Sequence, residues 1–320
     1  MLRIVLLVTL AVVTASVAMT SRPALAEETK AVLITGASTG IGRHLAETLA
    51  GAGYHVYAGA RKKKDLAELD AIDNITAVRL DVTSQEEVDA AVALISSSGS
   101  GLWGLVNNAG VGGGGGVVDT PIEDQNFVFD VNVEGVYRTT QAFAPLVMAS
   151  KGRIVTTGSI AGTISWGGGS AYAGSKHAME AYTDALAEEM APHGVSVSVI
   201  EPGNYKSNIR RSSVNRMIAQ RQSAGGEISD EMKAQLEQTT ERELSYKEPD
   251  DVSKAFLHAL FDDAPLRRYM VVPNQEEQGW TIGAKINELV QLNSWGPYSY
   301  SRDELVKMLD EALGAAPAEG

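Results

Sequence analysis

Residues 31–42 read AVLITGASTGIG and join a short apolar run to a glycine-rich turn. An uninterrupted apolar run of this kind predicts a strand buried on both faces, as in a parallel sheet. A helical pattern containing Leu45, Ala46 and Leu49 follows the turn. The free N–H groups and the positive dipole end of that helix favour an anion, and the glycines allow a diphosphate to approach the backbone closely.

Strands and helices alternate through most of the chain. Further strands are predicted at 54–58, 76–80, 102–106, 154–157, 195–200 and 269–272, and helices at 64–71, 85–95, 123–148, 171–191 and 250–261. Alternation with right-handed crossovers predicts an α/β, doubly wound fold: a seven-stranded, mainly parallel sheet with helices on both faces. Ligands bind such a sheet at the carboxyl ends of its strands.

Composition excludes several kinds of site. The chain has 320 residues, of which 44% are hydrophobic, enough for a sizeable core. It contains no cysteine, so disulfides, thiolate metal sites and a cysteine nucleophile are excluded. The net charge of −13 argues against nucleic acid or an anionic membrane as the main partner. The five histidines are scattered without ligand spacing, and we predict no metal site.

The first 26 residues differ from the rest. Arg3 precedes a mostly apolar run, and Ala24-Leu25-Ala26 fits the small-x-small cleavage pattern of a secretory signal peptide. The run is short for a permanent membrane span. We therefore expect a cleaved signal over 1–26, no stable membrane span after cleavage, and a periplasmic or secreted protein. The alternative is that the true start is Met19, which would make the protein cytoplasmic.

Two regions stand outside the strand–helix alternation of the domain predicted over 27–273. The segment 205–247 is polar and helix-favouring, and we interpret it as a substrate lid or as a solvated helical insertion. The extension 274–320 carries Trp280, Trp295, Tyr298 and Tyr300 before a helix expected at 301–313. These aromatic residues either close the pocket, form an interface or pack on the core.

The segment Ser159–Lys176, SIAGTISWGGGSAYAGSK, follows the fifth predicted strand and carries the candidate chemistry. Tyr172 and Lys176 are four residues apart and share one face of a predicted helix. A lysine ammonium there is expected to lower the tyrosine pKa from its usual value near ~10, so that the hydroxyl can exchange a proton with an alcohol or carbonyl oxygen. Ser159 can donate a second hydrogen bond to that oxygen. An exposed helix pair without function is the alternative.

The end of the second strand predicts which cofactor is preferred. Many dinucleotide sites have an acid there that binds the ribose 2′-hydroxyl. This chain has Ala60 followed by Arg61, which would pair with a 2′-phosphate, so we predict NADP(H) in preference to NAD(H). Arg43 is a candidate for a second phosphate contact, and Asp81 for a hydrogen bond to the adenine amino group. The alternatives are a solvated basic face at Arg61 and a helix-capping role for Asp81.

Together these motifs resemble the short-chain dehydrogenase/reductase family. The matching pieces are T-G-x-x-x-G-x-G at 35–42, Asp81, N-N-A-G at 107–110, Asn132, Ser159, Tyr172 with Lys176, and Pro202-Gly203. The resemblance covers about residues 30–272. It implies a Rossmann-fold catalytic domain, an oxidoreductase that acts on CH–OH groups, and a catalytic tetrad of Asn132, Ser159, Tyr172 and Lys176.

The resemblance also implies roles for individual residues. Tyr172 would donate a proton in reduction and accept one in oxidation, and Asn132 would hold a water that links Lys176 to solvent. Ser207 stands where the family usually has a threonine, and it keeps the hydroxyl. The implied cofactor contacts are Gly36, Ser38, Thr39, Gly40, Ile41, Gly42, Arg61, Asp81, Val82, Asn108, Ala109, Gly110, Tyr172, Lys176, Pro202, Gly203 and Ser207.

The substrate is less determined by the sequence. Ile164, Trp166 and Tyr205 suggest an apolar pocket, and Glu201 before Pro202 resembles members that act on steroids and retinoids. We therefore predict a carbonyl or secondary alcohol on a mainly hydrophobic small molecule, and a homo-oligomer, either dimer or tetramer. The alternatives are a non-catalytic dinucleotide-binding sensor and an isomerase or dehydratase of the same family.

Overall fold

The computed structural model describes residues 30–223 and 225–314, so the N-terminal segment 1–26 lies outside the described residues. Seven strands form one sheet in the order β3-β2-β1-β4-β5-β6-β7, and every neighbouring pair is parallel. The strands are β1 (Ala31–Ile34), β2 (His55–Ala60), β3 (Ile75–Arg79), β4 (Gly104–Asn107), β5 (Arg153–Thr157), β6 (Ser196–Pro202) and β7 (Arg268–Val271). The predicted doubly wound α/β fold is confirmed, and its strand order reverses between β1 and β4.

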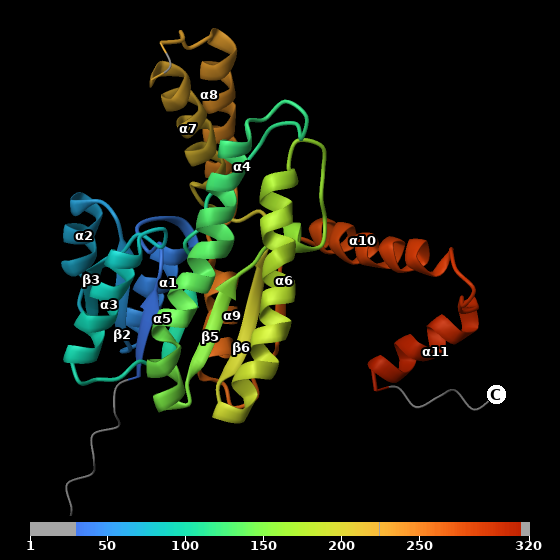
Figure 1. Ribbon diagram of the computed structural model, residues 1–320, viewed down its shortest axis with the longest axis horizontal. Helices are drawn as coiled ribbons and strands as arrows, with labels where there is room; N and C mark the ends of the chain where they lie inside the picture. The colour runs from blue at the N-terminus through green and yellow to red at the C-terminus, as the bar shows by residue number, and fades with distance from the viewer. Residues whose placement is uncertain (1–29, 224, 315–320) are drawn as a thin grey trace, which may run out of the picture.

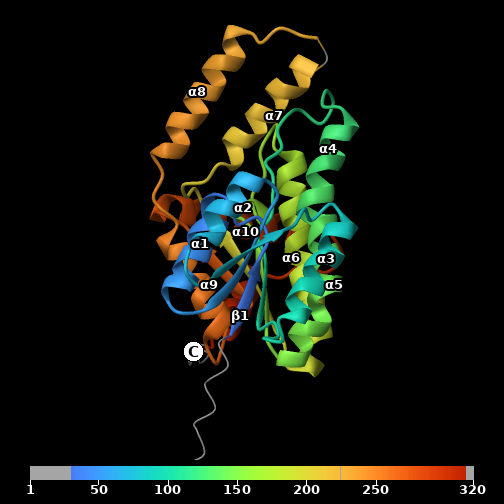
Figure 2. The ribbon, with the colours of Figure 1, turned by 90° about the vertical axis from the view of Figure 1, so that its left-hand side faces the viewer.

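Helices cover both faces of the sheet (Figures 1 and 2). One apolar core joins the sheet to α1 (Gly40–Gly51), α2 (Lys63–Asp70) and α9 (Asp250–Phe261). The other joins it to α3 (Gln85–Ser97), α5 (Gly135–Ser150) and α6 (Ser170–Met190). Because both faces are covered, β1 is buried along its whole length, as its uninterrupted apolar sequence predicts.

The single long helix predicted over 123–148 is interrupted. It consists of α4 (Ile122–Phe129), one π-helical segment (Asp130–Glu134) and α5. The π-helical segment contains Asn132, whose side chain is buried. Such bulges inside α-helices occur frequently at functional sites. The periodicity of the sequence did not reveal the bulge, because only one turn departs from the α-helical repeat.

The insertion after β6 forms a hairpin of α7 (Ile209–Ser223) and α8 (Asp230–Leu244), which projects beyond the carboxyl edge of the sheet (Figures 1 and 2). The buried side chain of Glu243 links the two helices, because its Oε1 accepts hydrogen bonds from the backbone N–H groups of Arg210 (2.8 Å) and Arg211 (3.3 Å). A carboxylate at the N-terminus of α7 also complements the helix dipole. That the hairpin opens and closes as a lid stays a prediction.

The C-terminal extension does not pack along the core as one alternative expected. It contains α10 (Gln275–Asn293), which we did not predict, and α11 (Arg302–Ala312), close to the predicted helix at 301–313. Both helices project away from the sheet (Figure 1). Trp295 and Tyr298, in the connection between them, are 92% and 91% exposed, so these aromatic residues close no pocket in this chain. Within the described ranges, no helix is long and apolar enough to cross a membrane.

Candidate active site

A cavity of about 490 Å³ lies at the carboxyl edge of the sheet, beside the point where the strand order reverses. Its lining combines the glycine-rich turn after β1, the ends of further strands and the start of α7. All seventeen predicted cofactor contacts line it, and so do Ser159, Tyr172 and Lys176. The structure therefore brings together residues from seven separate stretches of the sequence. In the described part of the chain, no group of three or more His, Cys, Asp or Glu side chains is placed to hold a metal ion.

The glycines of the turn are required by close contacts with the end of β4. Gly36 has φ +67°, and a Cβ on it would lie 2.7 Å from Ala109 Cα. A Cβ on Gly42 would lie 2.3 Å from Asn108 Nδ2 and 2.6 Å from Gly36 O. Side chains at these two positions would push the turn away from the end of β4, so glycine keeps the turn in place at the helix N-terminus, where a diphosphate can bind. The turn is thus shaped for the group that its sequence suggests.

Asn108 connects the ends of three strands. Its Nδ2 donates to the carbonyl oxygens of Thr35 (3.0 Å) and Gly36 (3.2 Å), and its Oδ1 accepts from Thr157 Oγ1 (3.1 Å). Thr35 Oγ1 in turn accepts from the backbone N–H groups of Asn108 and Ala109, both at 2.9 Å. These bonds hold the glycine-rich turn against β4 and β5.

The three reactive side chains converge where β5 meets α6. Ser159, directly after β5, is buried and hydrogen-bonds with its hydroxyl to Tyr172 on the first turn of α6. Lys176 lies one turn further along, and its Nζ is 5.8 Å from the centroid of the Tyr172 ring. The same Nζ donates a 2.7 Å hydrogen bond to Thr157 O. The spacing of Tyr172 and Lys176 therefore places both side chains at the cavity, and the alternative of an exposed helix pair is wrong.

The expected lowering of the Tyr172 pKa by Lys176 is not found in the structure. Burial raises the pKa of Tyr172, and the hydrogen bond from Ser159 and the charge of Arg210 only partly oppose it. Burial also lowers the pKa of Lys176 to about 8, against the opposing charge of Glu180. Desolvation therefore disfavours the charged form of both residues. A neutral tyrosine hydroxyl is consequently the form that this site stabilises.

Asn132 lies behind the cavity rather than on its wall. Its Oδ1 accepts from Val111 N (2.8 Å), while its Nδ2 donates to Val111 O (3.0 Å) and Ser175 Oγ (3.0 Å). The side chain thereby fixes the start of the glycine loop to α6, one residue from Lys176. The structure assigns Asn132 this positioning role, and its part in a water relay stays a prediction.

A buried acidic pair that the sequence did not reveal lies behind Lys176. Arg268 Nε is 3.0 Å from Glu180 Oε2 and 4.0 Å from Glu201 Oε1, and Arg268 Nη2 donates to Asp184 Oδ2 at 2.7 Å. Burial, together with the negative charge of Glu180, raises the pKa of Glu201 to about 7 although Arg268 opposes this. Glu201 does not line the cavity, although the next residue, Pro202, does.

Glu201 predicts a specific dependence of stability on pH. Between the usual glutamate pKa of 4.5 and about 7, the unfolded chain has released this proton while the folded protein retains it. The free energy of unfolding therefore falls as pH rises through this window, by on the order of 3 kcal/mol from this group. We expect Glu201→Gln to remove that part of the slope, measured by urea unfolding from pH 4.5 to 7.5. Glu188→Gln, at an exposed position of α6, is the control that should keep the slope, and an unchanged slope in Glu201→Gln would contradict the assignment.

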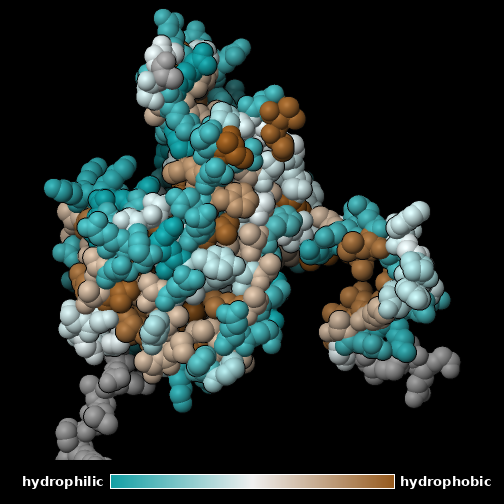
Figure 3. Space-filling view, viewed as in Figure 1, coloured by the Kyte–Doolittle hydropathy of each residue, from teal (hydrophilic) through white to brown (hydrophobic). Residues whose placement is uncertain are grey.

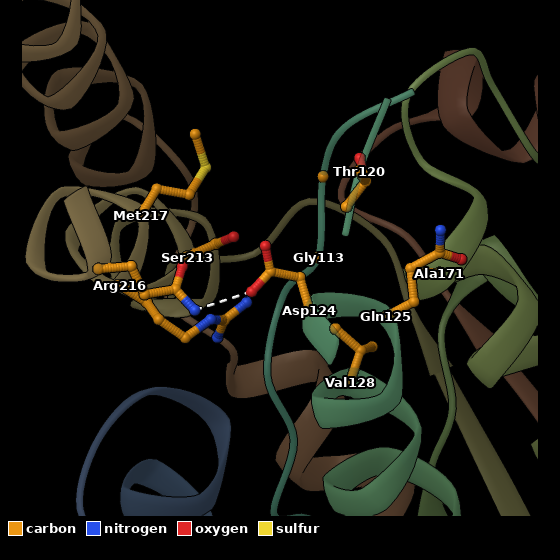
Figure 4. Close-up of a pocket in the computed structure, with 11 residues that line it drawn as sticks. Gly113, Thr120, Asp124, Gln125, Val128, Ala171, Ser213, Arg216 and Met217 are labelled. Atoms are coloured by element: carbon orange, nitrogen blue, oxygen red, sulfur yellow. Dashed lines mark hydrogen bonds between the residues drawn. The ribbon is translucent and has the colours of Figure 1, made fainter. Parts of the chain in front are cut away.

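A second, smaller cavity of about 30 Å³ lies between the glycine loop and α7 (Figure 4). A hydrogen bond of 2.8 Å from Gln220 Nε2 to Asp124 Oδ1 closes one side, and Arg216 donates to Gly112 O at 2.7 Å while its guanidinium lies 4.6 Å from the Phe127 ring centroid. These contacts hold α7 against the glycine loop. Of the three residues expected to form an apolar wall, Tyr205 lines the larger cavity, and Ile164 and Trp166 line neither.

Sequence reasoning missed the contribution of α7 to the larger cavity. The missed residues lie in one stretch and are mostly polar: Asn208, Ile209, Arg211, Ser212 and Asn215. This stretch has no recognisable motif, and only its position after the sixth predicted strand pointed to the site. The arrangement makes the substrate side of the cavity more polar than we expected.

Arg61 lies at the end of β2, as predicted, and lines the cavity. Its Nη1 is 3.5 Å from Asp81 Oδ2, and its side chain is 56% exposed, so the pair is weak and Arg61 remains accessible to another anion. Burial would raise the pKa of Asp81, but hydrogen bonds from Thr83 and the charge of Arg61 outweigh it and lower the pKa. Arg43 pairs with Glu47 on α1 and does not line the cavity, so our suggestion of a second phosphate contact is not supported.

Comparisons with known proteins agree with this geometry. A family model described as short chain dehydrogenase matches residues 30–217. The chain is 39% identical over 263 residues to the mitochondrial D-beta-hydroxybutyrate dehydrogenase of Bos taurus, covering 75% of this chain and 76% of the relative. It is 38% identical over 186 residues to retinol dehydrogenase 16 of Rattus norvegicus, covering 56% and 58%. The crystal structure of a short chain dehydrogenase/reductase from Burkholderia phymatum in complex with NAD matches with a TM-score of 0.71 and 27% identity, covering 85% of this chain and 98% of that one.

Proposed function

The chain belongs to the short-chain dehydrogenase/reductase family, and from this premise we propose that it is an NADP(H)-dependent oxidoreductase that interconverts a ketone and a secondary alcohol on a mainly hydrophobic small molecule. The observation that carries the proposal is the convergence of Ser159, Tyr172 and Lys176 on the cavity that the glycine-rich turn lines. The glycines at 36 and 42, where a Cβ would collide, fit a dinucleotide diphosphate.

Each of the site residues has a separate role in the proposed reaction. The nicotinamide, when bound, supplies a hydride to the carbonyl carbon or accepts one from the alcohol carbon. In reduction, the Tyr172 hydroxyl gives its proton to the oxygen that becomes the alcohol, and in oxidation it takes that proton back. The Ser159 hydroxyl redirects its single donated hydrogen bond from Tyr172 to the same oxygen and stabilises the charge that develops there. The Lys176 ammonium beside Tyr172 stabilises the phenolate formed during reduction.

Arg61 supports the preference for NADP(H). We expect Arg61→Ala to weaken NADP⁺ binding by about 10- to 100-fold, because a charged hydrogen bond to the 2′-phosphate contributes ~1.5–3 kcal/mol. NAD⁺ affinity should change little, since it carries no such phosphate. Titration calorimetry with both nucleotides measures the two affinities. Lys64→Ala is a matched control, because Lys64 belongs to the same basic run but lies outside the cavity lining. An undiminished preference for NADP⁺ in Arg61→Ala would discard this role.

A second substrate class is favoured by specific residues. Arg211 lines the cavity, and the charge of Arg210 acts on the Tyr172 hydroxyl. A carboxylate on the substrate would complement these arginines, and one relative is named for D-beta-hydroxybutyrate. The apolar lining, including Val111, Val131 and Tyr205, together with the retinol dehydrogenase similarity, supports the mainly hydrophobic substrate.

One experiment separates these functions. NADPH oxidation is followed with neutral ketosteroids and medium-chain ketones, and in parallel with 3-keto acids of matched chain length. Turnover of the neutral ketones supports the first proposal, and turnover confined to the keto acids selects the second. Tight nucleotide binding without turnover of any compound would favour the non-catalytic sensor.

A further inference from the structure

The C-terminal arm, residues 275–313, carries the most extensive exposed apolar surface among the described residues. Ile282, Ile286, Leu289 and Val290 on α10 are each about half exposed and are spaced to share one helix face. Leu309 on α11 and Leu313, the residue that caps its C-terminus, are 59% and 72% exposed. Figure 3 shows hydrophobic patches on the inner sides of the arm, around a hollow that the arm encloses.

Within the described residues, the arm is attached to its own domain at its beginning. Glu277 and Thr281 are buried, and Glu277 Oε2 accepts a 2.9 Å hydrogen bond from Asn204 N in the loop after Pro202 and Gly203. After this point α10 leaves the domain, and α11 lies further out (Figure 1). The apolar face therefore has no cover within the described part of its own chain.

The arm has a defined shape despite this separation. Asn293 clamps the connection, because its Nδ2 donates to Tyr300 O and its Oδ1 accepts from Tyr300 N, both at 2.8 Å. Ser301 and Glu304 then form a reciprocal capping box that starts α11. A preformed binding surface loses less conformational entropy when it meets a partner.

The exposed area is of the size that a stable interface needs. Aromatic side chains have ~150–250 Å² to bury, so Trp280, Trp295 and Tyr298 alone offer on the order of 500 Å². The two aliphatic helix faces add to this. The largest apolar patch of a typical monomer is about 300–600 Å², whereas a standard interface buries about 800 Å² per partner. The arm exceeds what a soluble monomer usually exposes and approaches what a dimer requires.

Charge argues for a protein partner over an anionic lipid surface. The segment 275–314 contains seven acidic and three basic residues, a net charge of −4. Helices that lie on anionic membranes carry lysine and arginine on their polar face. The arm has the opposite balance, and a membrane of anionic lipid would repel it.

We propose that the arms of two copies of this chain pack against each other as a four-helix interface that makes the protein a dimer. Outside the arm, the exposed large apolar residues of the described chain are fewer and scattered over α3, α4, α5, α7, α8 and loops. The surface on a second copy that best matches the arm is therefore the second arm. In a two-fold symmetric dimer every contact between the two arms occurs twice. The assembly is also closed, so no further copies can add to it through this surface.

The test compares the oligomeric state of the full chain with that of Ile286→Glu/Leu309→Glu, by sedimentation velocity over a range of concentrations. Both positions are exposed in the protomer, so the double variant should fold. Thermal unfolding and turnover per protomer check that it does. The wild type is expected to be dimeric, and the variant to dissociate at least 100-fold more readily. Leu94→Glu, at an exposed leucine of α3, is the matched control and should remain dimeric. A monomeric wild type, or a double variant as dimeric as wild type, overturns the proposal.

Two further measurements separate the remaining arrangements. Native mass spectrometry of wild type mixed with tagged Ile286→Glu/Leu309→Glu should show no mixed dimer, because the altered arm cannot pair. A mixed dimer would mean that the arm docks on the body of its partner, which overturns the arm-to-arm contact. Vesicle flotation with pure phosphatidylcholine, and with added phosphatidylserine, should leave wild type unbound. Capture by either vesicle that is lost in the double variant would identify a lipid surface instead.

Discussion

Replacing Tyr172 with phenylalanine is expected to lower kcat/KM by about 1,000-fold or more, while NADP⁺ affinity stays near that of wild type. The substitution removes only the hydroxyl, which is the atom that exchanges the proton and that hydrogen-bonds to Ser159. A positioned general acid or base contributes ~10²–10⁴-fold to the rate. Steady-state kinetics with the best ketone from the substrate panel gives the first quantity, and nucleotide titration gives the second.

The matched control for this prediction is Tyr182→Phe on the same helix. Tyr182 is buried and its hydroxyl is 2.6 Å from Thr140 Oγ1, remote from the cavity lining. Losing that hydrogen bond should cost about 1 kcal/mol of stability and leave turnover close to wild type. If Tyr172→Phe kept more than about a tenth of wild-type activity, well short of the loss expected from a general acid, the proton transfer would have to be assigned to another group.

Gly42→Ala is expected to weaken NADP⁺ binding by about 10- to 100-fold, equivalent to ~1–3 kcal/mol of strain from overpacking. A methyl group there would lie 2.3 Å from Asn108 Nδ2 and 2.6 Å from Gly36 O. Neither atom is free to retreat, because Asn108 Nδ2 already donates to the carbonyl oxygens of Thr35 and Gly36. The strain therefore moves the turn itself. Titration calorimetry measures the affinity, and thermal unfolding measures the accompanying loss of stability.

Gly51→Ala provides the control for this helix. A Cβ at Gly51, near the end of α1, would meet nothing within 4 Å. Alanine loses less conformational entropy than glycine in a helix, so stability should rise by ~0.5–1 kcal/mol with no change in NADP⁺ affinity. Equal nucleotide affinity in Gly42→Ala and wild type would show that this turn does not bind the cofactor.

The fold could be predicted from the sequence because the patterns that indicate its strands and helices are local. The run at 31–34 is apolar without interruption since β1 is buried on both faces, and the helix at 250–261 matches the structure residue for residue. The ends of several strands moved by one or two residues, as for β2 at 55–60 against the predicted 54–58. Hydrogen bonding with the neighbouring strand, rather than local preference, sets where such a strand ends.

The candidate site could be predicted only in those parts where the spacing of residues along the sequence sets their arrangement in space. Tyr172 and Lys176 share a helix face, and the glycine-rich turn needs only its own backbone freedom. The buried pair of Glu180 and Glu201 was not predictable, since it depends on Arg268 from a strand 67 residues further along the chain. The pKa of Tyr172 was predicted in the wrong direction, because burial outweighs the hydrogen bond from Ser159 and the charge of Arg210.

The sequence by itself determined the doubly wound sheet, the glycine-rich turn and the reactive residues Ser159, Tyr172 and Lys176, because periodicity and motif spacing act over a few residues. Only the tertiary structure decided the π-helical segment around Asn132, the polar wall that α7 adds to the cavity, and the projecting arm of α10 and α11. Each of these features depends on contacts between segments that are far apart in the sequence, or on the absence of such contacts. Burial and desolvation of a side chain follow from these contacts and cannot be read from its neighbours in the sequence.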